Sequence, residues 1–275
     1  MRVLVTTAVP AERDAVAAAF TAPGPASASA HTVPGAVLSR VALPAPSGGG
    51  DHLVLDLLAG GVGPAAAAAS TAAALTAATL NGEPYDVVVS AGIGGGFQPD
   101  APVGSLVLAD EITVADLGAE TTETAGAAGA TGATGATETP EIAETAHGFI
   151  PVTELGFGTV THRPPNSLVR EIAAVTGSRQ GSVLTVSTVT GSAARAVELR
   201  RRHPRALAEA MEGFGVAEAA SAHGVPVLEI RAVSNPVGPR DRAAWRIGEA
   251  LAALTGAFGK LAPVLESWNP HDLTH

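Results

Sequence analysis

The sequence predicts an α/β sandwich built around a mostly parallel sheet. Two observations predict it: short apolar runs typical of buried strands recur along the chain, and helix-like segments stand between them. The length of 275 residues fits one large α/β domain or two small ones. A chain of this size buries about three quarters of its unfolded surface, which is enough for a sizeable core.

The expected strands are apolar or β-branched runs bounded by proline, glycine or other turn residues. They cover residues 2–7, 36–43, 52–58, 87–90, 103–114 (one long strand or a pair), 182–188 and 226–234. A glycine cluster at 92–96 follows the strand at 87–90. Glycine lets backbone N–H groups approach a ligand closely, so this cluster is a candidate binding element.

The expected helices have apolar residues at helical spacing or runs of small residues. They cover residues 11–20, 64–80, 166–177, 192–203, 211–224 and about 241–266. Pro64 suits the first turn of its helix, where no N–H is needed. Residues 57–80 are long enough for a membrane span, but their small side chains and Gly63-Pro64 favour a helix packed on the sheet.

Residues 119–146 interrupt this alternation. They are almost all Ala, Gly, Thr and Glu and contain no aromatic residue, so they have too little apolar side chain to offset the entropy of ordering. We expect a flexible surface insertion within a single domain that covers residues 1–275, not a linker between two domains.

Composition excludes several classes of protein. With 16 Lys and Arg against 26 Asp and Glu the formal net charge is −10, which argues against binding to nucleic acid or to an anionic membrane. Because there is no cysteine, disulfide scaffolds, thiolate metal sites and cysteine nucleophiles are excluded. The eight histidines are scattered, so we expect no metal and no cofactor. The amino terminus lacks the pattern of a signal peptide, and we expect a cytoplasmic protein.

One glycine motif fits a dinucleotide-binding pattern weakly. Residues 61–66 match G-x-G-x-x-A between a strand and a helix. They do not open the first βαβ unit, and Pro64 removes an N–H that would face a pyrophosphate. A non-catalytic nucleoside- or dinucleotide-binding module therefore remains an alternative.

Polar residues stand at strand ends and helix starts, where α/β sheets usually place their sites. Glu12 follows the first strand, Met211 and Glu212 open a helix, and Arg231 and Asn235 close a strand. Each residue alone has an ordinary structural interpretation as a first-turn acid, a helix start or a turn residue. Together they predict a binding site.

In combination these residues resemble the nucleoside phosphorylase superfamily, especially the nucleosidase branch that includes methylthioadenosine/adenosylhomocysteine nucleosidase. The motifs that carry the resemblance are Val-Thr-Thr-Ala-Val-Pro-Ala-Glu12, Leu-Ala-Gly-Gly-Val-Gly63, Val-Ser-Ala-Gly-Ile-Gly-Gly95, Ala-Met211-Glu212 and Arg231-Ala-Val-Ser-Asn235. The resemblance implies a three-layer sandwich with a central mixed, mostly parallel sheet. It also implies a homodimer or larger homo-oligomer that acts on a purine nucleoside.

The resemblance assigns roles residue by residue. Glu12 would activate water, Met211 would pack on the ribose, and Glu212 would hold the sugar hydroxyls. Gly94 and Gly95 would lie against the substrate, and either Arg231 or Ser90 would compensate for hydrogen bonds to the sugar that this chain lacks. Two departures from the family pattern reduce the hydrogen bonding expected to the sugar. Ile93 replaces a serine, and Ala210 replaces the first glutamate of Glu-Met-Glu.

Asn235 stands where the nucleosidases have an aspartate that protonates adenine. A carboxamide offers an NH₂ donor to a 6-oxo group and an oxygen that accepts from N7–H, so Asn235 favours hypoxanthine or guanine over adenine. We expect Glu12 and Asn235 to be the catalytic residues.

The run Ser-Asn-Pro-Val-Gly-Pro-Arg-Asp241 followed by Trp245 resembles the futalosine hydrolases of this superfamily. That resemblance implies hydrolysis of futalosine to hypoxanthine and dehypoxanthine futalosine in a route to menaquinone. Asp241 is either the acid for the leaving base or a turn carboxylate, and Arg240 is a candidate partner for the benzoate of futalosine. A 6-oxopurine nucleoside phosphorylase or an inosine/guanosine nucleosidase is the alternative, although the first turn supplies no arginine for phosphate.

The chain has only nine aromatic residues, so few of them are available to form the apolar wall of a pocket for a purine and a benzoate. We expect Phe20, Tyr85 and Phe258 in the core, and Phe149, Phe157, Phe214 and Trp245 near the ligand. An aromatic residue that the family carries before Gly191-Ser192 is missing, and we expect Phe157 or Phe149 to replace it as a substrate-binding residue.

Overall fold

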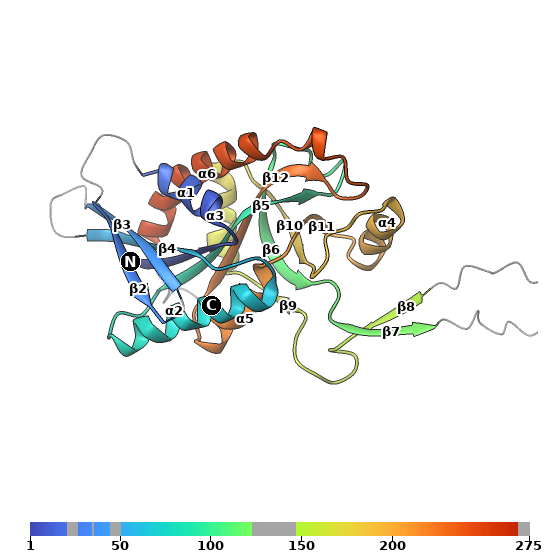
Figure 1. The fold of residues 1–275 in the computed structure, drawn as a ribbon, viewed down its shortest axis with the longest axis horizontal. Coiled ribbons are helices and arrows are strands. Elements are labelled where there is room, and N and C mark those ends of the chain that lie inside the picture. The colour runs from blue at the N-terminus through green and yellow to red at the C-terminus, as the bar shows by residue number, and fades with distance from the viewer. Residues whose placement is uncertain (21–26, 35, 45–50, 123–146, 269–275) are drawn as a thin grey trace, which may run out of the picture. The chain divides into compact units, whose positions relative to one another are not determined.

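The computed structural model describes residues 1–20, 27–34, 36–44, 51–122 and 147–268 (Figure 1). The chain divides into two compact units, one formed by Met1–Ala115 with Thr161–His275 and one formed by Asp116–Val160. The first unit contains a ten-stranded sheet with helices on both faces, and the second contains a two-stranded hairpin. No helix in the described ranges is long and apolar enough to cross a membrane.

The large sheet contains every strand of the first unit. They are β1 (Arg2–Thr7), β2 (Ser27–Val33), β3 (Ala36–Pro44), β4 (Asp51–Ala59), β5 (Val87–Gly96), β6 (Leu106–Val114), β9 (Thr161–His162), β10 (Arg179–Thr185), β11 (Ala206–Ala210) and β12 (Val227–Pro236). Their order is β11-β10-β6-β12-β5-β1-β4-β3-β2, with β9 paired to β6. The mixed sheet is confirmed: β5 pairs in parallel with β1 and β12, while β2, β3 and β4 form an antiparallel meander.

One end of the sheet closes on itself. Strand β11 at the edge pairs in parallel with β10 and also antiparallel with the last glycines of β5. The strands β5, β12, β6, β10 and β11 therefore form a closed ring. Closure brings residues from distant parts of the chain to both sides of Gly94 and Gly95, and this arrangement positions the site described below.

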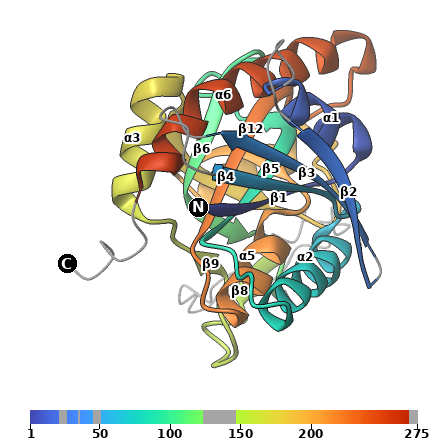
Figure 2. The same cartoon turned by 90° about the vertical axis from the view of Figure 1, so that its left-hand side faces the viewer.

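Helices cover the two faces of the sheet, as Figures 1 and 2 show. They are α1 (Pro10–Ala18), α2 (Pro64–Leu80), α3 (Asn166–Thr176), α4 (Ala193–Arg202), α5 (Gly213–Ala222) and α6 (Ile247–Ser267), with a short 3₁₀ turn at Arg242–Ala244. Helices α1, α3 and α6 pack together on one face, and α2 packs with α5 on the other. The three-layer α/β sandwich is therefore confirmed.

The main core lies between the sheet and α1, α3 and α6. It is built mostly from Val, Leu, Ile and Ala side chains, together with the buried ring of Phe258. Phe20 packs against this core from a partly buried position. Tyr85 is also buried, as expected, but its hydroxyl donates to the carboxylate of Asp56.

The second unit has one regular feature, the antiparallel pair β7 (Gly118–Thr122) and β8 (His147–Pro151). Gly118 is required at this pairing because a Cβ there would come within 2.2 Å of the Ile150 carbonyl oxygen. The predicted insertion at 119–146 overlaps β7, and its residues 123–146 lie outside the described residues. The prediction of a single domain with a surface insertion stays a prediction.

The elements differ from the prediction in three places. Strands β2, β7, β8, β9 and β11 are additional, because these segments lack the sustained β-branched pattern that marks a strand. The glycine cluster 92–96 is not a turn after a strand but the second half of β5. The last helix begins at Ile247, later than about 241, because residues 242–244 form a 3₁₀ turn before it.

Candidate active site

A cavity of about 390 Å³ lies at the carboxyl ends of β1, β5, β11 and β12. Six residues expected at the site line it: Glu12, Gly94, Gly95, Met211, Glu212 and Asn235. Parallel strands present their carboxyl ends at one edge of a sheet, so residues 200 positions apart in the sequence meet there. Its volume is in the range of small-molecule pockets.

Glu12 lies at the floor of the cavity and is only 4% exposed. Its Oε2 accepts hydrogen bonds from the backbone N–H groups of Ala8 (2.9 Å) and Val9 (3.3 Å), at the start of α1. Its Oε1 accepts from the N–H of Ile93 on β5 (2.9 Å). The carboxylate is therefore both a cap for α1 and a group held in one orientation at the cavity, and its role in catalysis stays a prediction.

Gly92 is the reason Glu12 fits beside β5. A Cβ at this position would come 2.6 Å from Glu12 Oε1 and 2.7 Å from Arg231 Nη1. No side chain can occupy that space without moving one of the two charged groups. The absence of a Cβ at Gly92 thus lets a carboxylate and a guanidinium approach the same point of the strand.

Glu212 precedes α5 and is held by both of its oxygens. Oε1 accepts from the N–H of Gly63 (3.2 Å), and Oε2 accepts from the N–H of Met211 and from Nη1 of Arg231 (3.3 Å each). Gly63 has a φ of 92°, a conformation that favours glycine. The glycine turn that resembled a dinucleotide motif therefore places an N–H on the carboxylate of Glu212.

Arg231 does not line the cavity but lies beneath it, 1% exposed. Its guanidinium donates to Glu229 Oε1 (2.9 Å), to Glu212 Oε2 and to Ser90 Oγ (3.0 Å). Burial lowers the pKa of Arg231, but the carboxylates of Glu229, Glu212 and Glu12 outweigh burial and hold that pKa above its usual range. Arg231 is thus a fixed cation that orients Glu212 from below.

Glu229 is a member of this group that the sequence analysis did not find. It is fully buried on β12, and among the described residues its Oε2 has no hydrogen-bond partner. Burial raises the pKa of Glu229, and the neighbouring Arg231 offsets this only in part. Gly213 makes room for the carboxylate, because a Cβ there would come 2.1 Å from Oε2. The one signal was an acidic residue in the apolar run 227–233.

Asn235 lies near the end of β12 with its carboxamide orientation fixed. Its Oδ1 accepts from Ser234 Oγ (2.9 Å), and its Nδ2 donates to the carbonyl of Pro236 (3.0 Å). An amide nitrogen carries two N–H groups, so the second can donate to a ligand. Asn235 therefore presents a donor to the cavity, as its chemistry predicts for a 6-oxo group.

Glu209 is the second carboxylate that the sequence analysis did not find, and unlike Glu229 it lines the cavity. It is 5% exposed on β11, and its two oxygens accept from the N–H (2.8 Å) and the hydroxyl (2.5 Å) of Thr190. The segment Ala-Leu-Ala-Glu209-Ala was not predicted to be a strand, so its carboxylate had no predicted position.

The aromatic predictions have different outcomes. Trp245 lines the cavity with Arg240, whose guanidinium lies 5.5 Å from the indole ring centre. Phe214 is buried away from the cavity and packs on His162 with a ring separation of 5.3 Å. Phe149 and Phe157 belong to the second unit, where Phe157 is 68% exposed, and their role in substrate binding stays a prediction.

Asp241 accepts a hydrogen bond from the N–H of Ala243 (3.1 Å), which is the geometry of a turn carboxylate. Of its two interpretations, the structure therefore supports the one as a cap for the 3₁₀ turn. Within the described ranges, no group of three or more His, Cys, Asp or Glu side chains is arranged to hold a metal ion.

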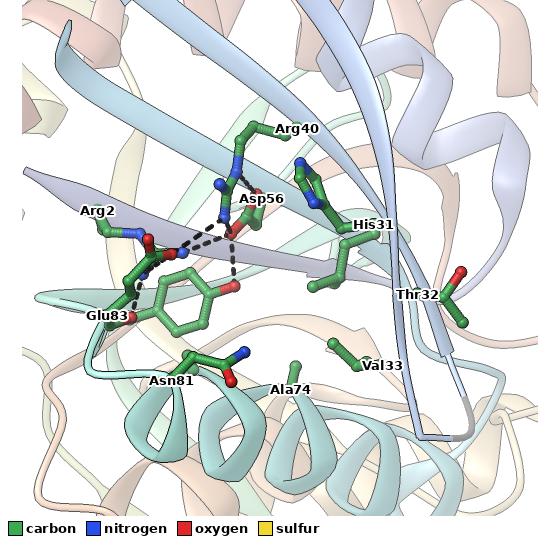
Figure 3. A pocket seen from close by; sticks show the side chains of 12 residues that line it. Arg2, His31, Thr32, Val33, Arg40, Asp56, Ala74, Asn81 and Glu83 are labelled. Atoms are coloured by element: carbon green, nitrogen blue, oxygen red, sulfur yellow. Dashed lines mark hydrogen bonds and ion pairs between the residues drawn. The ribbon is translucent and has the colours of Figure 1, made fainter.

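A second cavity, of about 300 Å³, lies beside β2, β3, β4 and α2 (Figure 3). The polar residues that line it are grouped around the carboxylate of Asp56. This carboxylate accepts hydrogen bonds from Arg40 Nε (2.8 Å) and Nη2 (2.9 Å). It also accepts from Arg2 Nη2 (3.1 Å) and from the Tyr85 hydroxyl (2.6 Å). Glu83 adds ion pairs to both arginines. Burial raises the pKa of Asp56, but these donors outweigh it and hold that pKa below its usual range.

Comparison with known proteins identifies the family of the chain. The sequence profile of the phosphorylase superfamily matches residues 3–263. The futalosine hydrolase of Streptomyces coelicolor is 66% identical over 272 residues, which cover 99% of this chain and all of the relative.

Two solved structures have the same fold. An S-adenosylhomocysteine nucleosidase from Streptococcus pyogenes, in complex with 5-methylthiotubericidin, superposes with a TM-score of 0.71 at 16% identity, over 98% of each chain. The native structure of futalosine hydrolase from Helicobacter pylori superposes with a TM-score of 0.69 at 14% identity, over 96% of this chain and 98% of the other. The chain belongs to the phosphorylase superfamily and, within it, to the family of futalosine hydrolases.

Proposed function

We propose that this chain is a nucleosidase that hydrolyses the N-glycosidic bond of futalosine and releases hypoxanthine. The observation that carries the proposal is the cavity itself, in which Glu12 is held by three backbone N–H groups while Glu212 and Asn235 line the same space. The substrate is inferred from membership in the futalosine hydrolase family. A place in a route to menaquinone rests on the same resemblance.

Cleavage of an N-glycosidic bond passes through an oxocarbenium-like sugar, as glycoside hydrolysis does. Glu12 accepts a proton from the water that attacks C1′, which requires a carboxylate in hydrogen-bond reach of that water. Its three N–H partners hold it in place before substrate arrives, so little reorganisation is needed.

Glu212 accepts hydrogen bonds from the ribose hydroxyls, and its negative charge favours the cation that develops on the sugar. Arg231 is a positioning residue here, because it reaches the sugar only through Glu212. Met211 lines the cavity next to Glu212 and packs on the ribose.

Asn235 binds the leaving base. Its free N–H donates to O6 of the purine, and its oxygen is placed to accept from a protonated N7. A carboxamide supplies no acidic proton, so the proton that the leaving purine takes up at N7 comes from solvent water, and Glu12 returns to solvent the proton that it accepts from the attacking water.

The experiment compares futalosine, inosine and methylthioadenosine as substrates, with and without inorganic phosphate, and measures the free base. We expect futalosine to be preferred and the rate to be independent of phosphate. Preferred release of adenine from methylthioadenosine contradicts the role of Asn235, and a rate that requires phosphate supports the phosphorylase alternative. Binding of nucleosides without turnover supports the non-catalytic module.

Glu12→Gln tests the base. We expect kcat/KM to fall by a factor of about 10²–10⁴, the usual contribution of general base catalysis. The matched control is Glu171→Gln on the exposed face of α3, which leaves the rate unchanged. A Glu12→Gln enzyme at nearly the wild-type rate refutes the assignment.

Two broader predictions belong to the same proposal. We propose a homodimer or larger homo-oligomer, which light scattering measures directly, and a cytoplasmic location, which fractionation measures. Both rest on the sequence and on the resemblance.

A further inference from the structure

The charged side chains beneath the cavity follow one another along β12. Glu229 and Arg231 are two positions apart on this strand, so their side chains point to the same face, and Arg231 is the nearer of the two to the carboxyl end where the cavity lies. The register with β5 places Glu229 opposite Ser90 and Arg231 opposite Gly92. Glu12 Oε1 lies beside Gly92, 2.6 Å from the point where a Cβ would stand. From the interior toward the cavity the order is therefore Glu229, Arg231 and Glu12.

The charges in this column alternate in sign. The guanidinium of Arg231 follows the carboxylate of Glu229, and its Nη1 contacts the carboxylate of Glu212 at 3.3 Å. The same Nη1 approaches Glu12 over Gly92, where no side chain separates them. With every group ionised, one guanidinium faces three carboxylates, so the group as a whole is negative by two charges. A positive charge that develops on the sugar would be the next member of the series.

Glu229 is the main counter-charge of Arg231. Its Oε1 accepts from Nε of the guanidinium at 2.9 Å, whereas the contact of Nη1 with Glu212 Oε2 is longer, at 3.3 Å. Burial lowers the pKa of Arg231, and of the carboxylates that outweigh burial Glu229 acts most strongly. The guanidinium is therefore neutralised from the side away from the cavity, and less of its charge remains to cancel that of the carboxylates that face the ligand.

This counter-charge is held at a cost in stability. Glu229 is fully buried, and within the described ranges its Oε2 has no hydrogen-bond partner. Burial raises the pKa of Glu229, because the ionised form is disfavoured in the interior. A glutamine in its place would still accept from Arg231 Nε, and Glu212 would remain as a counter-charge. Stabilisation of the fold therefore does not by itself explain a carboxylate at this position.

We propose that Glu229 is a positioning residue that neutralises Arg231 from the interior, so that Glu12 and Glu212 present their full negative charge to a cationic sugar in the cavity. The inference rests on the proposed nucleosidase function and adds to it the source of the electrostatic preference for an oxocarbenium-like sugar. Glu229 does not line the cavity and acts through Arg231.

A purely structural role for Glu229 makes a different prediction. If Glu229 only holds Arg231 in place, its replacement changes the binding of charged and uncharged ligands to the same extent. Under our proposal, the loss depends on the charge of the ligand. Glu229→Gln separates the two roles, since it keeps an acceptor for Arg231 Nε and removes the charge.

The experiment measures the dissociation constants of two nucleoside analogues at pH 7 by calorimetry. Both carry the same 6-oxopurine-like base, joined to the sugar by a carbon–carbon bond that cannot be hydrolysed. One has a protonated nitrogen in the sugar ring, and the other has the ordinary ring oxygen. The ratio of the two dissociation constants reports the preference of the site for a cation, and effects common to both ligands cancel. We expect the wild-type protein to bind the cationic analogue more tightly by a factor of about 10 or more.

Three variants test the charge. Glu229→Gln should lower this preference by about 10-fold, the size expected for one unit charge about 10 Å from the ring nitrogen at an effective dielectric constant of about 20. The double variant Glu229→Gln/Arg231→Met removes one charge of each sign and should restore the wild-type ratio, although both analogues bind more weakly because Glu212 loses a hydrogen bond. The matched control is Asp56→Asn, which removes a buried carboxylate from the arginines of the second cavity and should leave the ratio unchanged.

The outcomes separate this inference from the proposed function. If Glu229→Gln keeps the wild-type ratio, as it would if Glu229 were protonated at pH 7, the inference is wrong, while the nucleosidase function stands. A double variant with the same ratio as Glu229→Gln also contradicts it, because Glu229 then does not act by neutralising Arg231. If the wild-type protein hydrolyses no purine nucleoside, the proposed function itself is wrong. Urea unfolding identifies any variant that does not fold, and Glu229→Met, which also removes the charge, then takes the place of Glu229→Gln alone and in the double variant.

Discussion

Two buried carboxylates of the same sheet have opposite environments. Asp56 on β4 and Glu229 on β12 are both 0% exposed. Asp56 accepts from two guanidinium groups and a phenol, whereas Glu229 accepts on Oε1 from Arg231 and has no partner for Oε2 in the described part of the chain. The pKa of Asp56 is accordingly below its usual range, and that of Glu229 is above its usual range because of burial.

The difference lies in how many donors each carboxylate receives. A buried charge is stabilised only when its hydrogen-bonding capacity is met. The hydrogen-bonding capacity of Asp56 is met by its donors. The two guanidinium groups among them are partly exposed, with 19% of the Arg2 side chain and 25% of the Arg40 side chain accessible. The hydrogen-bonding capacity of Glu229 is not met, and one fully buried guanidinium faces three carboxylates. The less satisfied group lies directly beneath the candidate active site, which is where proteins usually accept a loss of stability.

Removal of the Arg231 guanidinium should give the largest difference in stability and in rate between the Glu229 group and the Asp56 group. Arg231→Met leaves Glu229 and Glu212 without their guanidinium, and we expect the free energy of unfolding to fall by about 3–5 kcal/mol, the usual cost of breaking a buried ion pair from one side. The rate of hydrolysis should also fall, because Glu212 loses a hydrogen bond that orients it. Urea unfolding and kcat/KM measure the two effects.

Arg40→Met is the matched control in the other group. Asp56 keeps Arg2 and Tyr85, so we expect a smaller loss of about 1–3 kcal/mol and an unchanged rate. Equal losses of stability in the two variants, or a rate that falls in Arg40→Met, would contradict the distinction between a structural and a functional group.

Gly92→Ala tests the approach of the two charges without removing either. The added methyl group would lie 2.6 Å from Glu12 Oε1 and 2.7 Å from Arg231 Nη1, so one group must move. A displacement of about 1 Å in a catalytic group costs about 100-fold, and we expect at least that loss in kcat/KM.

Gly259→Ala on α6 is the control for Gly92→Ala. Nothing lies within 4 Å of a Cβ built at Gly259, and alanine is the better helix former, so we expect the wild-type rate and a small gain in stability. A Gly92→Ala enzyme with the same rate as this control shows that the position of Glu12 does not limit the reaction.

Much of the fold and the centre of the site were predictable from the sequence. The strand 2–7, the helix 64–80 and the strand predicted at 226–234 have patterns that local physics determines, namely β-branched runs and a proline in a first helical turn. Glu12 comes shortly after the first of these strands and Asn235 lies at the end of the last, so their meeting at one edge of the sheet follows from the parallel arrangement. Glu212 lies beside them because it follows β11, a strand that the sequence did not predict.

Glu209 and Glu229 were not predictable in the same way. Glu209 lies in the short strand β11 and Glu229 in the long strand β12, and in both a carboxylate resembles an outward-facing residue. Only the closure of β11 onto β5 turns Glu209 toward the cavity. The glycine half of β5 is a strand because β11 and β12 supply its hydrogen bonds on both sides, which outweighs the low strand propensity of glycine. Such features depend on pairing between distant segments and leave no local pattern.

The opposite pKa shifts predict opposite effects of pH on two neutral variants. Because the pKa of Asp56 is lowered on folding, its contribution to stability is complete above its unfolded value of about 3.9 and is lost as the pH falls through the folded value. Asp56→Asn should therefore be less stable than wild type at pH 7, by about 2 kcal/mol, and the deficit should shrink in acid.

Glu229→Gln should behave in the opposite sense. Because the pKa of Glu229 is raised on folding, ionisation of this group destabilises the fold increasingly as the pH rises above its unfolded value of about 4.3. The variant should gain stability relative to wild type as the pH rises, by about 1.4 kcal/mol for each pH unit between the unfolded and the folded pKa of Glu229. Unfolding curves between pH 3 and 9 measure both differences, and slopes of the same sign would show that the two carboxylates have the same environment.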